Sequence, residues 1–207
     1  MVVEAWRAGR VSADAERPAI AAMAADLAEL FASASAPERR GLYVASANAG
    51  FASSLAFWSG ATREGVAYAS PALFPWTLSN APCGWLAREF GLRGPNVTHT
   101  GRADALGAAL HQCWHDLDQR QADVGWVVAV DFGSGRGQPT TYAAMRVSDE
   151  SGPAALDRSG TTDPATRLRA SAVLARALAG VARRGRAAFS DGHSQWSITV
   201  TGSAQAR

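Results

Sequence analysis

Apolar residues recur along the chain at spacings that predict alternating helices and strands. Helices are predicted where apolar positions repeat every three or four residues, and strands where short apolar runs are bounded by turn residues. The predicted helices are residues 18–31, 51–60, 78–90, 103–119 and 167–183. The predicted strands are residues 41–46, 96–100, 124–132, 141–147 and 195–201.

The order of these elements predicts an α/β protein with a layered mixed sheet. Residues 124–132 form a continuous apolar run, which is typical of a strand buried on both faces of a sheet. Strands that alternate with helices favour right-handed crossovers and helices packed on the sheet. No repeat or second domain is visible, so we expect one domain over residues 1–207. The Gly-, Ser- and Thr-rich residues 151–162 are expected to be a flexible connector.

Composition excludes several chemistries. All 20 cationic side chains are arginine, and the absence of lysine excludes Schiff-base catalysis and a Gly-Lys-Ser/Thr phosphate loop. The net charge is only +2 and the arginines are scattered, which argues against nucleic-acid binding. Gly133, Gly135 and Gly137 precede a strand instead of opening a helix, so they do not predict a dinucleotide site. No cofactor is expected.

The sequence also indicates a cytoplasmic protein without a membrane anchor. Its first residues lack the basic segment and apolar run of a secretory signal. No apolar stretch reaches the ~20 residues needed to cross a bilayer. The two cysteines, Cys83 and Cys113, do not make a disulfide framework.

Three segments in order along the chain resemble β-ketoacyl synthases. The segment from Ser70 to Pro95 is similar to the stretch that precedes the nucleophile in that family. Residues 44–51 resemble its glycine-rich strand–helix element, and residues 122–131 resemble a later strand. The resemblance is best over residues 41–132, and it implies the fold of the N-terminal ketosynthase half, which is thiolase-like.

The same resemblance implies that the chain is not an enzyme by itself. In active members a cysteine lies shortly after the Gly-Pro pair, at the start of a helix whose dipole and free amides favour a thiolate. Here the corresponding residue is Ala103, or His99 if the alignment slides. The family also uses two histidines and a lysine in a C-terminal half. The sequence has no lysine, and His193 is too close to the end to match.

The family includes chain length factors, which are inactive ketosynthase paralogues that pair with an active synthase and shape its acyl tunnel. Carried onto this chain, the tunnel-gating residues are Phe51, Ser54 and Trp58, whose spacing places them on one helix face. The competing interpretation is that Phe51 and Trp58 are ordinary core residues.

The resemblance also implies a dimer interface and partners. In ketosynthase dimers the strand before the nucleophile pairs across the dimer axis. The interface residues here would be Val97, Thr98, His99 and Thr100. The expected partner is a full-length ketosynthase, in a type II polyketide system that receives acyl chains from an acyl carrier protein.

Two other functions remain open alternatives, and one pair of histidines is considered as a metal site. The chain could be a stand-alone acyl-binding or acyltransferase enzyme that uses His99 or Asp104, or a homodimeric structural remnant. His111 and His115 lie one helical turn apart with Asp116 and Asp118 nearby. No third or fourth ligand is evident, so no metal is expected.

Overall fold

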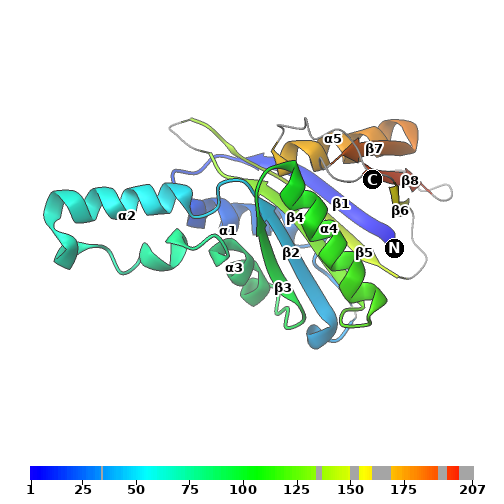
Figure 1. Ribbon diagram of the computed structural model, residues 1–207, viewed down its shortest axis with the longest axis horizontal. Helices are drawn as coiled ribbons and strands as arrows, with labels where there is room; N and C mark the ends of the chain where they lie inside the picture. The colour runs from blue at the N-terminus through cyan, green and yellow to red at the C-terminus, as the bar shows by residue number, and fades with distance from the viewer. Residues whose placement is uncertain (34, 134–136, 150–153, 160–168, 191–194, 201–207) are drawn as a thin grey trace.

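The computed structural model describes residues 1–33, 35–133, 137–149, 154–159, 169–190 and 195–200 (Figure 1). The helices are α1 (Glu16–Leu27), α2 (Phe51–Glu64), α3 (Ala81–Glu89), α4 (Ala103–Asp118) and α5 (Ala170–Arg184), with short 3-10 turns η1 (Pro37–Arg39), η2 (Val66–Tyr68) and η3 (Phe74–Thr77). The strands are β1 (Val2–Val11), β2 (Arg40–Ser46), β3 (Asn96–Thr100), β4 (Val124–Asp131), β5 (Thr140–Ser148), β6 (Ala154–Ser159), β7 (Arg186–Ser190) and β8 (Gln195–Val200).

The strands form one mixed sheet in the order β3-β2-β4-β5-β1-β6-β8-β7. Strand β2 pairs in parallel with β3 and β4, and every other pairing is antiparallel. All eight residues of β4 are buried, as the apolar run predicted for a central strand. The predicted α/β class with a layered mixed sheet is confirmed.

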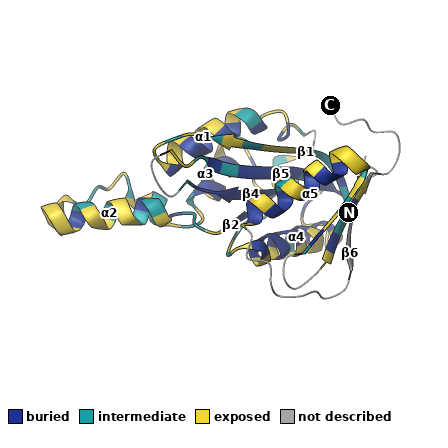
Figure 2. Cartoon of the chain, turned by 90° about the horizontal axis from the view of Figure 1, so that it is seen from above, coloured by how far each residue is buried: buried dark blue, intermediate teal, exposed yellow. Residues whose placement is uncertain are grey.

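Helices cover both faces of the part of the sheet formed by β3, β2, β4, β5 and β1. Helices α1 and α3 lie on one face, and α4 and α5 lie on the other (Figure 2). Strand alternation explains the two cores. From β2, Leu42 and Val44 join the core under α1 and α3, whereas Tyr43 and Ala45 join the core under α4 and α5.

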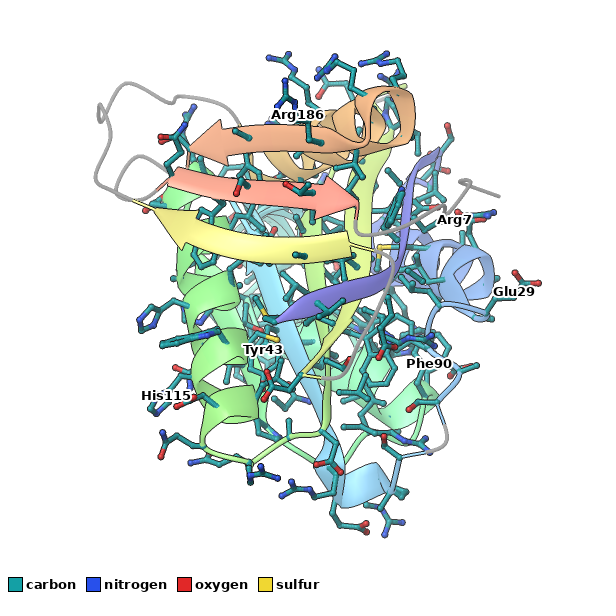
Figure 3. The ribbon with its side chains drawn as sticks, turned by 90° about the vertical axis from the view of Figure 1, so that its right-hand side faces the viewer. Arg7, Glu29, Tyr43, Phe90, His115 and Arg186 are labelled. Carbon is teal, nitrogen blue, oxygen red and sulfur yellow. The ribbon has the colours of Figure 1, made fainter. Side chains whose placement is uncertain are left out.

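The sheet curls beyond β1, so that α5 is packed between two sets of strands. Only Val2 and Val3 of β1 pair with β6. The β6–β8–β7 group then crosses the far side of α5 (Figure 3). Its apolar side chains, including Phe189 and Trp196, belong to the same core as Leu174 of α5. This central helix layer therefore has strands on two sides.

Three strands differ from the expectation from sequence. Residues 154–159 form β6 instead of a flexible connector, because they pair with β8 along their whole length. The remaining residues of the expected connector, 151–153 and 160–162, lie outside the described residues. Strands β1 and β7 were not predicted, because their apolar and charged residues do not alternate clearly. Tertiary pairing with β5 and β8 makes them strands.

The five predicted helices and the five predicted strands all occur, and most of them begin or end a few residues away from the predicted positions. The first helix begins at Glu16 and ends at Leu27, and the second extends to Glu64. Residues 167–168 and 201, at the ends of a predicted helix and strand, lie outside the described part of the chain. No helix within that part is long and apolar enough to cross a membrane.

Candidate functional site

The most unusual surface of the protein is an arm of residues 51–78, formed by α2, η2 and η3. The arm extends away from the layered body (Figures 1 and 2). Only two residues of α2, Ser53 and Ala61, are buried. The only charged residues of the arm are Arg63 and Glu64. Its exposed large apolar side chains are Phe51, Leu55, Trp58, Val66, Tyr68, Phe74 and Leu78.

These exposures exclude one of the two interpretations of the aromatic residues on α2. Phe51 is 56% exposed and Trp58 is 61% exposed, so neither is a core residue of this chain. Their spacing of seven residues places both on one face of the helix. Ser54 differs from them, because it is half-buried and its hydroxyl donates to the carbonyl of Thr77 at 3.4 Å. The interpretation of Phe51 and Trp58 as ordinary core is wrong.

The two limbs of the arm pack on each other through a small interior. The ring of Phe57 lies 6.0 Å from that of Phe74 in η3, and also 6.0 Å, edge-on, from that of Trp58. The contact between Phe57 and Phe74 holds α2 against η3, and the helix face with Phe51 and Trp58 stays exposed. An exposed, largely apolar surface of this kind is typical of an interaction site.

The root of the arm is fixed by a buried carboxylate. Glu16 is only 2% exposed, and it accepts hydrogen bonds from the backbone N–H groups of Gly50 (3.1 Å) and Ala52 (3.2 Å). These amides are at the N-terminus of α2, where a negative charge is stabilising. Gly50 has a φ of 81°, and a Cβ there would lie 2.6 Å from the carbonyl oxygen of Thr77. Glycine is therefore required where the two limbs of the arm meet the body.

The loop between β2 and α2 is tied to the end of β4 by further polar contacts. Asn48 donates to the carbonyl of Phe132 at 2.7 Å and accepts from its N–H at 2.9 Å. Asp131 accepts from the N–H of Ala47 at 3.1 Å. The arm thus protrudes from a root that several hydrogen bonds fix, so its apolar face is held at a defined position.

Glu16 gives the protein a testable dependence on pH. Burial raises the pKa of its carboxyl above the ordinary value near 4.5, although hydrogen bonds from Gly50, Ser53 and Ala52 oppose the shift. Between the unfolded and folded pKa values the folded state binds more protons, so the free energy of unfolding falls as pH rises through that window. We expect the stability of wild type relative to Glu16→Gln to increase as pH is lowered from neutral to 4.5.

Urea denaturation of both proteins over a series of pH values measures this difference in the free energy of unfolding. The Gln variant keeps an oxygen acceptor but does not titrate, so it serves as the reference. A difference that stays constant from neutral pH down to 4.5 would contradict the prediction.

Strand β3 is the second feature of the site. It ends the sheet and pairs only with β2 among the described strands, so its other edge is open. Val97, Thr98 and His99 are half-buried, and Thr100 is exposed. Thr100 pairs with Ser46, directly before the loop that leads into the arm. The open edge and the root of the arm are therefore adjacent.

The start of α4 holds Ala103, the residue that the sequence resemblance predicts at the nucleophile position. Ala103 is the first residue of α4, three residues after the end of β3, and it is 1% exposed. On β3, the Nε2 atom of His99 is buried without a hydrogen-bond partner, and burial lowers the pKa of this imidazole. The ring is therefore neutral at pH 7.

Neither cysteine supplies a thiolate in place of Ala103. Burial raises the pKa of the Cys83 thiol to about 12, and its sulfur lies 2.7 Å from Oδ1 of Asn96. Cys113 is fully buried within α4, and burial raises its thiol pKa well above the ordinary value. Both thiols are protonated at neutral pH, and a protonated thiol is a poor nucleophile.

The residues of the alternative sites do not assemble. Asp104 accepts from the N–H of Arg102 at 2.8 Å, and no hydrogen bond joins it to His99 in the described structure. His111 and His115 are exposed, whereas Asp116 is buried and accepts from the hydroxyl of Tyr43 at 2.9 Å. Within the described residues, no group of three or more His, Cys, Asp or Glu side chains is placed to hold a metal ion.

Solved structures with a similar fold come from ketosynthase assemblies. One chain of the complex between a ketosynthase (ApeO) and its chain length factor (ApeC) from Xenorhabdus doucetiae matches with a TM-score of 0.56 and 14% identity, over 77% of this chain and 69% of that chain. A second match is a chain of AntDE:AntF, a type II PKS acyl-carrier protein in complex with its ketosynthase. It has a TM-score of 0.50 and 12% identity, and the match covers 70% of this chain and 50% of that chain. This chain has a ketosynthase-like fold.

The matched chains differ in length. The coverages of 77% and 69% mean that the first matched chain is of comparable length to this one. This chain spans about half of the second. It also spans about half of a chain of the ishigamide ketosynthase/chain length factor, at 18% identity and a TM-score of 0.49. No protein-family model and no curated protein matches the sequence.

Proposed function

We propose that the chain is a non-catalytic, chain-length-factor-like subunit. It forms a heterodimer with an active β-ketoacyl synthase and shapes the acyl tunnel of that enzyme. The observation that carries the proposal is the largely apolar arm, which is exposed in the single chain and rooted beside the open edge of β3. A surface of this kind needs a protein partner, because the arm's aromatic side chains are otherwise left in water.

The ketosynthase-like fold supports the kind of partner. The first similar structure is named as a ketosynthase with its chain length factor, and another as a ketosynthase with an acyl-carrier protein. We extend these assemblies to this chain, and infer that its partner is a full-length ketosynthase that receives acyl groups from a carrier protein.

The chemistry at the start of α4 supports a non-catalytic role. A methyl group at Ala103 cannot attack a thioester, and both cysteine thiols are buried and protonated. The Nε2 atom of His99 is buried without a hydrogen-bond partner, so no described group takes or supplies a proton there. The stand-alone acyltransferase is therefore the weaker proposal. Acyl transfer from a carrier protein to the purified chain alone would favour it.

Two sets of residues carry the proposed contacts. The open edge of β3, with Val97, Thr98, His99 and Thr100, is proposed to pair across the dimer axis. The arm, with Phe51, Ser54 and Trp58, is proposed to reach the partner and limit the depth of its tunnel. Exposed edge strands need such a covering partner to avoid aggregation.

The decisive experiment is co-expression with a cysteine-bearing ketosynthase, followed by size-exclusion chromatography with light scattering. We expect a one-to-one heterodimer that elutes as a single species. A chain that remains monomeric and never co-elutes with a ketosynthase would refute the partner proposal. A stable homodimer would favour the structural remnant.

Trp58→Ala tests the role of the arm in the tunnel. If Trp58 limits tunnel depth in the complex, removal of its ring leaves a cavity, and the complex should then make longer acyl products. Mass spectrometry of the products measures this shift. The control is Trp114→Ala, because Trp114 is also exposed but lies on α4. An unchanged product distribution from a stable Trp58→Ala complex would place Trp58 outside the tunnel.

A further inference from the structure

Strand β7 is the other end of the sheet, opposite to β3 in the strand order. It pairs with β8 along residues 186–190, and in Figure 3 it is the outermost strand, marked by Arg186. Among the described strands only β8 pairs with β7, so within the described residues no strand lies along the other edge of residues 186–189. Such an edge is a template for pairing with another extended segment.

A cavity of about 320 Å³ lies between α5 and this edge. Its strand side consists of four consecutive residues, Ala187, Ala188, Phe189 and Ser190. Successive side chains of a strand point to opposite faces, so a hollow that contacts all four follows the edge of the strand instead of one face. Its helix side consists of Val173, Arg176, Ala177 and Arg184.

The cavity lies in a strongly cationic part of the chain. Residues 169–190 contain five arginines and no acidic residue, although the whole chain carries a net charge of only +2. Arg176 and Arg184 on the wall of the cavity are exposed, and no ion pair within the described residues neutralises them. Their planar guanidinium groups are suited to binding carboxylates.

Gly180 positions one of these arginines. A Cβ at this position would lie 2.8 Å from a guanidinium nitrogen of Arg184 and 3.0 Å from the Cβ of Ala187. A glycine, which is a poor helix former, therefore lets Arg184 lie across α5 and lets the helix approach β7 closely. The wall of the cavity depends on this contact.

We propose that an extended acidic polypeptide segment binds here as an additional strand on β7. Its backbone pairs with the open edge, its carboxylates pair with Arg176 and Arg184, and a small apolar side chain contacts Val173 and Phe189. Main-chain hydrogen bonds and side-chain pockets are combined in this way wherever a peptide extends a sheet. A second copy of this chain is disfavoured as the occupant, because two such arginine-rich edges repel each other.

This site is separate from the proposed ketosynthase interface, because β7 and β3 are at opposite ends of the strand order. Its test therefore uses the full chain and does not depend on the heterodimer. The probe is a fluorescent peptide of alternating glutamate and valine, and binding is measured by anisotropy. Hydrogen exchange of the β7 amides gives a second readout, since added strand pairing slows their exchange.

We expect the acidic peptide to bind, and Arg176→Gln/Arg184→Gln to weaken its binding at least about tenfold through the loss of two charge-assisted pairs. The control Arg17→Gln/Arg88→Gln removes the same charge from exposed arginines of α1 and α3, and should change binding less than about twofold. A peptide with alternate N-methylated amides keeps its charge but cannot pair as a strand, and should not bind.

Four results would overturn the proposal. If the acidic peptide does not bind, the arginines act only to keep the edge from pairing with other chains. Equal loss of binding in both double variants would mean that net charge, and not this cavity, attracts the peptide. Undiminished binding of the N-methylated peptide, or unchanged hydrogen exchange in β7, would exclude strand addition.

Discussion

Trp58→Asp is expected to weaken the binding of the chain to the proposed ketosynthase partner by at least about 100-fold, the loss expected for a tryptophan at the centre of an interface. The ring is 61% exposed in the single chain and lies on the same face of α2 as Phe51. Burial of a carboxylate in place of that ring requires its desolvation without a partner. Because Trp58 is largely exposed before binding, the folding of the chain itself should change little.

Two controls separate loss of the interface from loss of the fold. Trp114→Asp makes the same chemical change at an exposed tryptophan of α4, outside the arm, and should leave the affinity within about twofold. Thermal denaturation of each variant alone should match wild type within a few degrees. Biolayer interferometry with immobilised ketosynthase measures the affinities, and wild-type affinity of Trp58→Asp would show that the arm is not the interface.

Asp131→Ala is expected to lower the free energy of unfolding by about 3–5 kcal/mol. Asp131 is fully buried at the end of β4, and accepts from the N–H of Ser171 at 3.0 Å and from its hydroxyl at 2.5 Å. It also accepts from the N–H of Ala47. One carboxylate thus joins the central strand, the N-terminus of α5 and the root of the arm, and its removal leaves buried donors without acceptors.

Denaturation by guanidinium chloride, followed by circular dichroism, measures the difference. Asp123→Ala is the matched control, because Asp123 pairs with Arg39 at the surface and its side chain is half exposed. Surface pairs contribute little, so this variant should lose less than about 1 kcal/mol. Ser171→Ala removes one of the three donors and should fall between the two. Equal losses for the two aspartate variants would refute the structural role of Asp131.

Local sequence pattern was sufficient for most of the layered body. The apolar run at residues 124–132 predicted a buried central strand, because a strand covered on both faces leaves no position for polar side chains. The apolar repeat of α4 predicted a buried stripe of Leu106, Leu110, Cys113, Trp114 and Leu117, and all of these except the exposed Trp114 are buried. The segments resembling ketosynthases led to the correct fold, and they placed Ala103 near a helix start, where the structure has it.

The same patterns were insufficient where an element depends on a distant partner. Residues 154–159 consist of small and polar residues that suggest a connector, but pairing with β8 makes them a strand. Strand β1 has no clear alternation, and its place beside β5 is fixed by register with residues 140–148. The polar contacts at the root of the arm join residues 34 to 84 positions apart, and no local spacing indicates them.

The sequence by itself determined the fold class and the central strand. Each of these follows from residues close together in the chain. Only the tertiary structure decided that Phe51 and Trp58 are exposed, because a helical spacing shows which side chains share a face and not whether anything covers it. The open edges of β3 and β7 were likewise decided by strand order, which depends on how distant segments pack.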